Sequence, residues 1–286
     1  MNIAAGRWMR RALLAVLSLA GASGPASEAA AQAAQASELL SRPADYALVW
    51  SDEFMNDGLP DGSRWAYDTG RNQQGWHNRE MQYYGLARTQ NTEVRNGALH
   101  ITAHKEQLSG AADWGGQRYT SGRLITLGKA EWTYGFFEVR ARLPCGKGSW
   151  PAIWMLGSRG EWPLGGELDI MEQVGKDPSR VFSTVHTAAG SGGSGAGAAV
   201  QTPDACTAFH NYQMHWTEQQ IRFGIDGKTH FTYVNPGTGS RQWPFDAPQF
   251  LILNIAIGGD LGGPVDDSIF PIQMEIDYVR VYQKAK

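Results

Sequence analysis

Cysteine, long apolar runs and excess positive charge are all scarce in this sequence of 286 residues. It contains two cysteines, and no group of cysteines and histidines has the spacing of a structural zinc site. No segment approaches the roughly 20 apolar residues that a membrane-spanning helix needs. The formal net charge is −3, so the chain lacks the basic footprint of a nucleic-acid-binding protein. The sequence therefore argues against zinc-finger, nucleic-acid-binding and transmembrane-helix proteins.

Helical periodicity is almost absent as well, and short alternating runs take its place. In residues 97–103, for example, alternate positions are apolar and share one face of a strand. Asp226 and Gly227 separate two such runs and predict a two-residue hairpin. Residues 250–257 are almost continuously apolar, as in a strand buried on both faces. Since no βαβ rhythm appears, we expect an all-β, two-sheet β-sandwich of the jelly-roll type.

Residues 1–36 have the composition of a secretory signal peptide. Three arginines precede an apolar run over residues 12–20, and small residues follow it. This order is typical of a leader that is removed on export. The apolar run is too short to span a bilayer, and an uncleaved anchor is the alternative. We therefore expect an exported protein, periplasmic or extracellular, with one domain over residues 37–286.

Cys145 and Cys206 are the only cysteines. In an exported protein, two cysteines suggest one disulfide, here closing a loop of about 60 residues. Such a bridge stabilises the fold by about 4 kcal/mol in the chain-entropy model. Two buried free thiols are the alternative.

Three carboxylates, Glu167, Asp169 and Glu172, lie within six positions of an apolar, strand-like run. Burying unpaired carboxylates is costly, so packing alone does not explain this placement. The period of two puts Glu167 and Asp169 on one face, and a β-bulge near Ile170–Met171 brings Glu172 to the same face. The two Glu carboxyls then lie roughly 5–6 Å apart, if the side chains lean inward. This is near the spacing of about 5–5.5 Å in a retaining glycosidase.

Tryptophans just upstream support the same chemistry. A solvated acidic strand or a calcium site is the alternative for the carboxylates, because three of them also suit a hard cation. However, Trp150, Trp154 and Trp162 precede the cluster, and Trp150 and Trp154 share one face of an extended segment. Aromatic rings bind flat apolar faces, which sugar rings have. The carboxylates and tryptophans together predict glycoside hydrolysis.

With these residues in view, the chain resembles the laminarinase-like enzymes of glycoside hydrolase family 16. The matching segments follow one another through most of the sequence after the leader. A short acidic motif alone is weak support, but this order of segments along one chain is specific. The segments are residues 50–54 (WSDEF), 78–84 (NREMQYY), 134–144 (YGFFEVRARLP), 150–156 (WPAIWML), 167–172 (ELDIME), 184–187 (TVHT), 253–259 (LNIAIGG) and 277–282 (DYVRVY).

The resemblance implies a β-jelly roll in which one concave sheet forms an open substrate cleft. It makes Glu167 the nucleophile, Glu172 the general acid/base, and Asp169 an electrostatic helper between them. A structural carboxylate that caps nearby backbone is the alternative for Asp169. The resemblance implies no cofactor for catalysis, since carboxyl groups fill both roles.

The resemblance also assigns residues to the substrate. Their alternatives are a core position for Trp150 and a satisfied structural histidine for His186. The Gly-rich residues 188–199 are predicted to form a flexible loop that shapes one rim of the cleft. The expected sugar-stacking platforms are Trp150, Trp154 and Trp162, and the expected polar contacts are His186, Asn78 and Arg123.

Many enzymes of the family bind a structural calcium ion away from the cleft. The matching positions here are Glu53, Gly97, through its carbonyl, and Asp277. Oxygen ligands from both ends of the chain are suited to calcium. An ordinary surface carboxylate is the alternative for Glu53 and Asp277.

The expected activity is retaining endo-hydrolysis of internal 1,3-β-D-glucosidic bonds in a laminarin-like β-glucan. The extra residue Met171 resembles the laminarinase branch, because enzymes restricted to mixed linkages tend to lack it. A 1,3-1,4-β-glucanase, a galactan hydrolase and a non-catalytic β-glucan-binding lectin are the alternatives. The expected partner is the polysaccharide, with no nucleic acid or membrane, and the expected state is a monomer.

Overall fold

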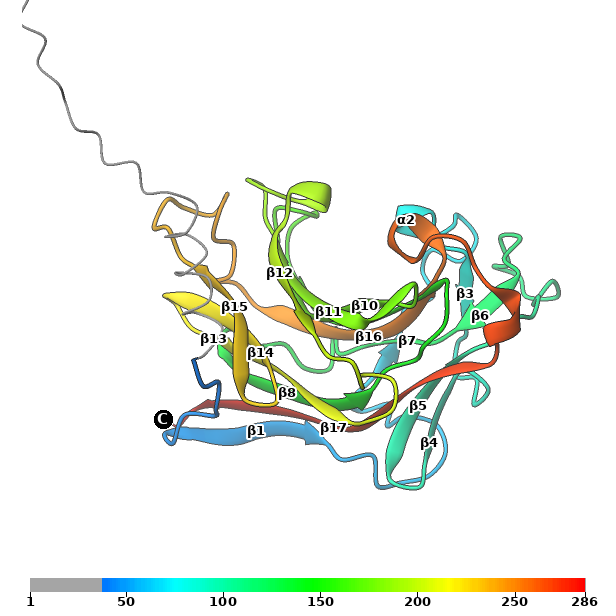
Figure 1. Cartoon of the computed structure of the whole chain (residues 1–286), viewed down its shortest axis with the longest axis horizontal. Helices are drawn as coiled ribbons and strands as arrows, with labels where there is room; N and C mark the ends of the chain where they lie inside the picture. Colours follow the sequence, from blue (N-terminus) through cyan, green and yellow to red (C-terminus); the bar gives the residue numbers. More distant parts are fainter. Residues whose placement is uncertain (1–37, 286) are drawn as a thin grey trace, which may run out of the picture.

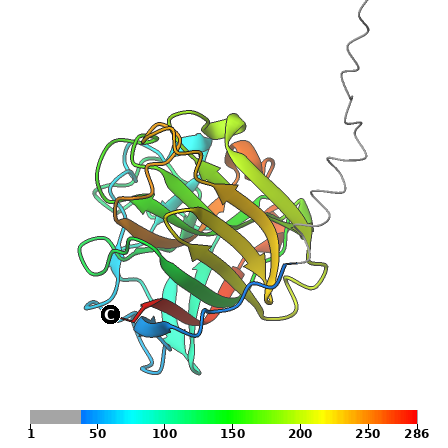
Figure 2. The ribbon, with the colours of Figure 1, turned by 90° about the vertical axis from the view of Figure 1, so that its left-hand side faces the viewer.

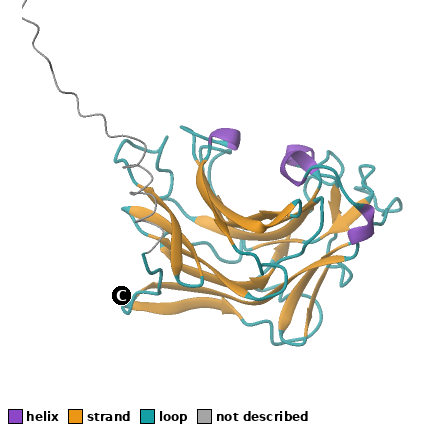
Figure 3. Cartoon of the chain, in the orientation of Figure 1, coloured by secondary structure: helices purple, strands orange, loops and turns teal. Residues whose placement is uncertain are grey.

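The computed structural model describes residues 38–285, and strands dominate it (Figure 1, Figure 3). The predicted signal peptide over residues 1–36 lies outside the described residues. Within the described part, no helix combines the length and apolarity needed to cross a membrane. The short helices lie in the connections between strands: η1 (His77–Arg79), η2 (Gly192–Ser194), α2 (Gly259–Gly262) and η3 (Asp267–Ile269).

An eight-stranded antiparallel sheet forms one layer of the molecule. Its strands run in the order β15, β14, β13, β8, β17, β5, β4, and β1 also pairs with β17. The pairing of β1 with β17 joins the two ends of the described chain in one sheet. The strands are β1 (Tyr46–Asp52), β4 (Thr92–Arg95), β5 (Ala98–Ala103), β8 (Gly135–Arg142), β13 (His210–Trp216), β14 (Gln220–Ile225), β15 (Lys228–Val234) and β17 (Ile272–Lys284).

A seven-stranded antiparallel sheet forms the second layer, in the order β12, β11, β10, β9, β16, β7, β2. It curves strongly, with β12 at one end of the curve and α2 near the other, as Figure 1 shows. A small parallel pair, β3 (Gln82–Tyr84) with β6 (Tyr119–Ser121), lies beside it. The strands are β2 (Ala66–Tyr67), β7 (Arg123–Ile125), β9 (Ser149–Gly157), β10 (Glu167–Val174), β11 (Asp177–His186), β12 (Ala196–Gln201) and β16 (Gln249–Ile257).

The main hydrophobic core fills the space between the two sheets (Figure 1, Figure 2). Alternate side chains of each strand enter it, for example Ile153 and Leu168 from one sheet and Val139 and Val279 from the other. These four side chains are at most 1% exposed. The predicted all-β, two-sheet sandwich is confirmed, because the alternating sequence pattern is the pattern of sheets with one buried face.

The predicted hairpin is also confirmed. Asp226 and Gly227 connect β14 to β15, and Ile225 pairs with Lys228 across the turn. Both turn residues have positive φ, 50° and 77°. This conformation matches the right-handed twist of the flanking strands, and it explains the Asp-Gly sequence.

The prediction of a flexible loop over residues 188–199 is wrong for residues 196–199. From Ala196 the chain forms the edge strand β12, which pairs with β11 from Val185 to Arg180. Glycine here permits close packing: a Cβ on Gly197 would lie 2.5 Å from the carbonyl oxygen of Ser183. The Gly-rich composition thus reflects strand contact as well as turns.

Cys145 and Cys206 form a disulfide with their Cα atoms 5.7 Å apart. The bridge links the segment after β8 to the segment before β13. These two strands are neighbours in the larger sheet, so the bridge links the segments next to two paired strands.

Candidate active site

A β-bulge in β10 brings three acids to one face of the curved sheet. Asp169 and Glu172 pair with Thr184 and Phe182 of β11, so three steps on β10 match two steps on its neighbour. The register against β9 shifts in the same place, between Asp169 and Met171. The predicted bulge is therefore confirmed at Ile170–Met171. Without the extra residue, Glu172 would point into the core.

The acids lie on the concave face. Leu168, Ile170 and Met171 all belong to the core between the sheets and are at most 1% exposed. The intervening acids must point to the opposite side of the sheet, which Figure 1 shows as the inside of the curve. The predicted distance between the Glu carboxyls, roughly 5–6 Å, stays a prediction.

Gly166 fixes the start of this strand. Its φ is +76°, and a Cβ there would lie 2.6 Å from the ring of Phe245. Only glycine meets both conditions at low cost. The next residue, Glu167, is partly exposed, and its carboxylate accepts a hydrogen bond from the indole N–H of Trp162. Glu167 thus faces solvent on the side where a substrate would approach.

Asp169 is enclosed between Glu167 and His186. It is 2% exposed, and its Oδ2 lies 3.2 Å from Nε2 of His186. Burial raises the pKa of Asp169 well above its usual range, and the charges of Glu167 and Glu172 raise it further. A carboxyl that keeps its proton can donate a hydrogen bond to Glu167, and the interaction with Glu167 is one cause of the raised pKa. The predicted role of Asp169 as an electrostatic helper stays a prediction.

The surroundings of Glu172 raise its affinity for a proton. It is 8% exposed, and burial raises its pKa to about 8. The indole N–H of Trp150 donates to Glu172 Oε1 over 2.9 Å and opposes this rise, whereas the charges of Glu167 and Glu80 add to it. Glu172 is therefore protonated at neutral pH, as a general acid must be.

The three predicted tryptophans have different positions. Trp162 is 54% exposed in the β9–β10 connection, close to the ring of His186, with the ring centroids 6.3 Å apart. Trp154 is partly exposed on β9, pairs with Asp169, and donates to Asn254 over 2.7 Å. Trp150 is 7% exposed, and its indole N–H is hydrogen-bonded to Glu172. Its predicted stacking on a sugar ring stays a prediction.

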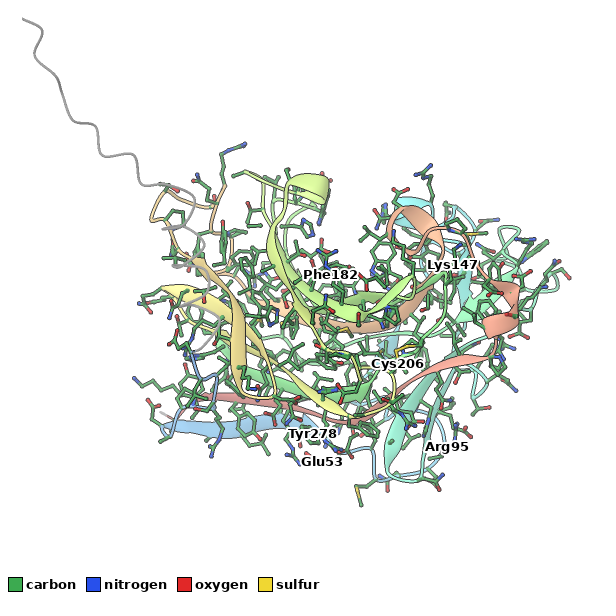
Figure 4. All side chains as sticks on the ribbon, in the orientation of Figure 1. Glu53, Arg95, Lys147, Phe182, Cys206 and Tyr278 are labelled. Carbon is green, nitrogen blue, oxygen red and sulfur yellow. A yellow bond between two sulfur atoms is a disulfide. The ribbon has the colours of Figure 1, made fainter. Side chains whose placement is uncertain are left out.

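A small apolar cluster surrounds the Trp150 ring. It contains Val174, Ala256 and the partly exposed Phe182. Figure 4 places Phe182 on the curved sheet. This cluster makes the neighbourhood of Glu172 apolar, which explains the cost of ionising that carboxyl.

The predicted polar contacts lie at two places. Arg123 on β7 is largely covered: its guanidinium lies about 5 Å from the ring centroids of both Trp76 and Trp154, and its Nε lies 2.9 Å from Asp68. Asn78 is exposed in η1, with its side-chain amide 3.4 Å from Glu80. Their contacts with sugar hydroxyls stay predictions.

Sequence reasoning missed a fourth carboxyl, Glu80. It accepts a hydrogen bond from Gln82 over 2.8 Å, and burial raises its pKa. Its charge raises the pKa of Glu172, so it belongs to the electrostatics of the site. Glu80 stands in a matching segment of the family, residues 78–84, and this was the available signal.

Sequence reasoning also missed the support behind the bulge. The Ser183 hydroxyl lies 2.8 Å from the carbonyl oxygen of Ile170 and 3.0 Å from Nε2 of His230. Ser183 has one proton, so if it donates to Ile170, His230 must donate to Ser183. Burial lowers the pKa of His230 to about 4, and the ring is neutral at physiological pH.

The predicted calcium ligands lie on the outer face of the larger sheet, and each carboxylate contacts an arginine. Glu53 accepts two hydrogen bonds from Arg280, at 3.0 and 2.7 Å. Asp277 lies 2.5 Å from Arg140 and lines a surface pocket together with Gly97. Figure 4 shows Glu53 and the neighbouring Tyr278 on the outer sheet, away from Phe182. The calcium site stays a prediction.

The arrangement on the concave face can perform acid-assisted nucleophilic substitution. Glu167 is accessible and oriented, and Glu172 carries a proton in an apolar setting. The two catalytic roles in retaining glycoside hydrolysis need this combination of two carboxyls in unlike environments. Both lie on one strand and share one face.

Comparison with known proteins agrees with this chemistry. The model for glycosyl hydrolases family 16 matches residues 79–280. The β-glucanase of Rhodothermus marinus is 46% identical over 261 residues, which cover 86% of this chain and 88% of that protein.

Solved structures give the same result. A variant of SCLam, a non-specific endo-β-1,3(4)-glucanase co-crystallised with 1,3-β-D-cellotriosyl-glucose, is 49% identical with a TM-score of 0.85. The match covers 87% of this chain and 98% of that one. The laminarinase of Rhodothermus marinus is 47% identical with a TM-score of 0.79, covering 84% of this chain and 98% of that one.

Proposed function

The chain belongs to glycosyl hydrolases family 16, and from this membership we propose that it is an endo-1,3-β-glucanase that hydrolyses internal bonds of laminarin-like β-glucans with retention. The observation that carries the proposal is the pair Glu167 and Glu172 on one concave face. One is accessible and hydrogen-bonded, and the other has its pKa raised to about 8 by burial.

The mechanism follows from these environments. Glu167 attacks the anomeric carbon while Glu172 gives its proton to the leaving glycosidic oxygen, forming a glycosyl–enzyme ester. Glu172, now ionised, then takes a proton from water, which attacks the same carbon and releases Glu167. Two inversions give net retention. Asp169 holds Glu167 in line, and the N–H of Trp150 stabilises the ionised Glu172 between the two steps.

A mixed-linkage substrate is the second candidate. It is favoured by the 49% identity to SCLam, described as acting on β-1,3(4)-glucan and crystallised with an oligosaccharide of that type. The bulge at Ile170–Met171 favours β-1,3 bonds as the preferred target, as the resemblance implies.

The test measures reducing-sugar release from laminarin, lichenan and agarose by the wild-type protein and by Glu167→Gln and Glu172→Gln. We expect laminarin to be cleaved fastest, lichenan more slowly and agarose not at all. Both variants should lose at least about 10³-fold in kcat with unchanged circular dichroism. Lichenan as the clear favourite would keep the mechanism and replace the substrate. Binding of laminarin without cleavage by the wild type would support the lectin instead.

Export of the protein is a further part of this proposal. It rests on the leader composition of residues 1–36 and is supported by the Cys145–Cys206 disulfide, because structural disulfides persist in oxidising compartments. Fractionation of expressing cells, with N-terminal sequencing of the product, tests it. A protein retained in the cytoplasm with its N-terminus intact would contradict it. The monomeric state stays a prediction that light scattering can test.

A structural calcium ion also stays a prediction. To bind it, Glu53 and Asp277 would have to leave Arg280 and Arg140. Thermal unfolding with EDTA and with millimolar CaCl₂ decides the matter. A rise in the midpoint with calcium, abolished in Asp277→Asn, would establish the site. Equal midpoints would show that the arginine pairs persist.

A further inference from the structure

Two carboxylates and one histidine converge on the concave face. One ligand atom from each of Glu167, Asp169 and His186 lies within 4.8 Å of the other two. Among the described residues, no other set of three such side chains meets this condition. The three come from neighbouring strands, since Glu167 on β10 pairs directly with His186 on β11. Their backbone positions are therefore fixed by the sheet.

Part of this cluster lacks a hydrogen-bond partner. Asp169 is 2% exposed, and its Oδ2, which points toward His186, accepts no hydrogen bond. Nδ1 of His186 also has no partner. A buried polar atom left unpaired is unfavourable, so a group that satisfies it binds with an advantage. Glu167 completes the set from the open side, where solvent reaches it.

The close approach of Gly195 leaves His186 little freedom to turn away. A Cβ on Gly195 would lie 2.5 Å from Nδ1 of His186, so only glycine fits beside the ring. The imidazole is thus confined between the β11–β12 connection and Asp169. A ligand set held in place before the ligand arrives loses little conformational freedom on binding.

We propose that Glu167, Asp169 and His186 form a binding site for a divalent transition-metal ion of the Zn²⁺, Co²⁺ and Ni²⁺ type, and that the bound ion inhibits hydrolysis. Imidazole with carboxylates suits these ions, and three protein ligands leave positions open for water. Ca²⁺ and Mg²⁺ prefer larger sets of oxygen ligands. Binding of the ion releases the proton that Asp169 holds beside Glu167.

Inhibition follows from the ligand identity. A carboxylate oxygen of Glu167 that is bonded to a metal ion cannot attack an anomeric carbon, and the ion occupies space that the sugar needs. Metal and oligosaccharide therefore exclude each other. This part rests on the proposed function, whereas metal binding itself does not.

The test uses isothermal titration of the EDTA-treated, dialysed protein with ZnCl₂, and the visible absorption of a Co²⁺ titration. We expect one ion per chain in the wild type. His186→Ala and Asp169→Asn should each weaken binding at least about tenfold. Two variants are used so that a folding defect in one, seen by circular dichroism, leaves the other informative.

His210→Ala is the matched control. His210 also contacts two carboxylates, Asp226 at 2.6 Å through Nδ1 and Asp204 at 3.2 Å through Nε2. These partners lie on opposite ring nitrogens, so they cannot converge on one ion. His210→Ala should bind Zn²⁺ as the wild type does. Equal Zn²⁺ binding by the wild type, His186→Ala and Asp169→Asn would overturn the site.

The inhibitory part is measured separately on laminarin hydrolysis. Zn²⁺ should raise KM without changing kcat, and EDTA should restore the original rate. Saturating Zn²⁺ without any loss of rate would overturn inhibition. If the wild type cleaves no glucan, the titration still reports on the metal site, so failure of the proposed function and failure of this inference are distinguishable.

Discussion

Carboxylates on the two outer faces of the sandwich have opposite surroundings. On the face of the larger sheet, three acids each contact an arginine: Glu53 with Arg280, Glu275 with Arg142 and Asp277 with Arg140. On the concave face, among the described residues, Glu167, Asp169 and Glu172 form no ion pair with lysine or arginine. Their polar neighbours are tryptophan N–H groups, one histidine and one another.

The difference in partners changes the proton affinity of the same chemical group. Hydrogen bonds from Arg280 lower the pKa of Glu53, so it stays ionised. Burial without a cation raises the pKa of Glu172 to about 8, so it keeps its proton at neutral pH. A paired acid contributes to the fold, whereas an unpaired buried acid is available for chemistry at a cost in stability.

The largest expected effect is that removing an acid raises the free energy of unfolding on the concave face and lowers it on the face of the larger sheet. Glu172→Gln should lose at least about 10³-fold in kcat and raise the free energy of unfolding at pH 8 by about 1–3 kcal/mol. Glu275→Gln, which breaks the 2.6 Å pair with Arg142, should keep full activity and lower stability by at most about 1 kcal/mol. Kinetics on laminarin and urea unfolding check both variants.

The stability gain depends on pH. The folded state holds the Glu172 proton up to about pH 8, while the unfolded chain releases it near pH 4. Wild-type stability therefore falls between these values, because the native state binds more protons there. The gain of Glu172→Gln should be absent at pH 4 and fully present above pH 8. A gain of equal size at both pH values would refute this origin.

The second largest expected effect comes from placing a positive charge beside Glu172. Phe182 pairs with Glu172 across the strands, so Phe182→Arg places a guanidinium beside the acid. An adjacent positive charge lowers a carboxyl pKa by about 1–3 units. The alkaline limb of the rate profile should move to lower pH, with about tenfold less activity at pH 7 and little loss at pH 5. Phe182→Leu controls for the lost ring, and an unmoved limb in Phe182→Arg would contradict the prediction.

A smaller effect concerns the bulge that brings the third acid to the concave face. Ser183→Ala removes the hydroxyl contact to the carbonyl of Ile170 and leaves a buried acceptor unpaired. We expect a stability loss of about 1–2 kcal/mol and a several-fold lower kcat with KM unchanged. Ser268→Ala, which removes an exposed hydroxyl from a loop contact to Asp266, should change neither. Equal kcat in both variants would show that the Ser183 contact does not affect catalysis.

The sandwich and the acidic face were predictable because both follow from local periodicity. The bulge was predictable because Glu167 and Glu172 stand five positions apart, and only an odd insertion gives them a common face. Asn254 also left a signal, as a polar residue in the apolar run of β16 that holds Trp154.

Contacts between distant strands left no such signal. Ser183 on β11 and His230 on β15 are 47 positions apart, and their contact depends on how the two sheets pack together. The role of Trp150 likewise depends on the register of β9 against β10, which turns its N–H toward Glu172. The loop prediction for residues 196–199 was wrong because it rested on composition, which indicates chain flexibility. Pairing with β11 decides whether a strand forms there.

The smallest expected effect tests whether unpaired charges act across the concave face at longer range. Glu80 is largely covered, and its charge raises the pKa of Glu172. Glu80→Gln removes that charge and keeps the amide able to bond with Gln82, so the alkaline limb should move down by less than about one unit. Activity at pH 8 should fall about two- to threefold, and activity at pH 5 should not change. Glu93→Gln, an acid of the outer face paired with Arg95, should leave the whole profile in place. Equal pH–rate profiles for Glu80→Gln and wild type would show that only burial and the immediate neighbours of Glu172 set its pKa.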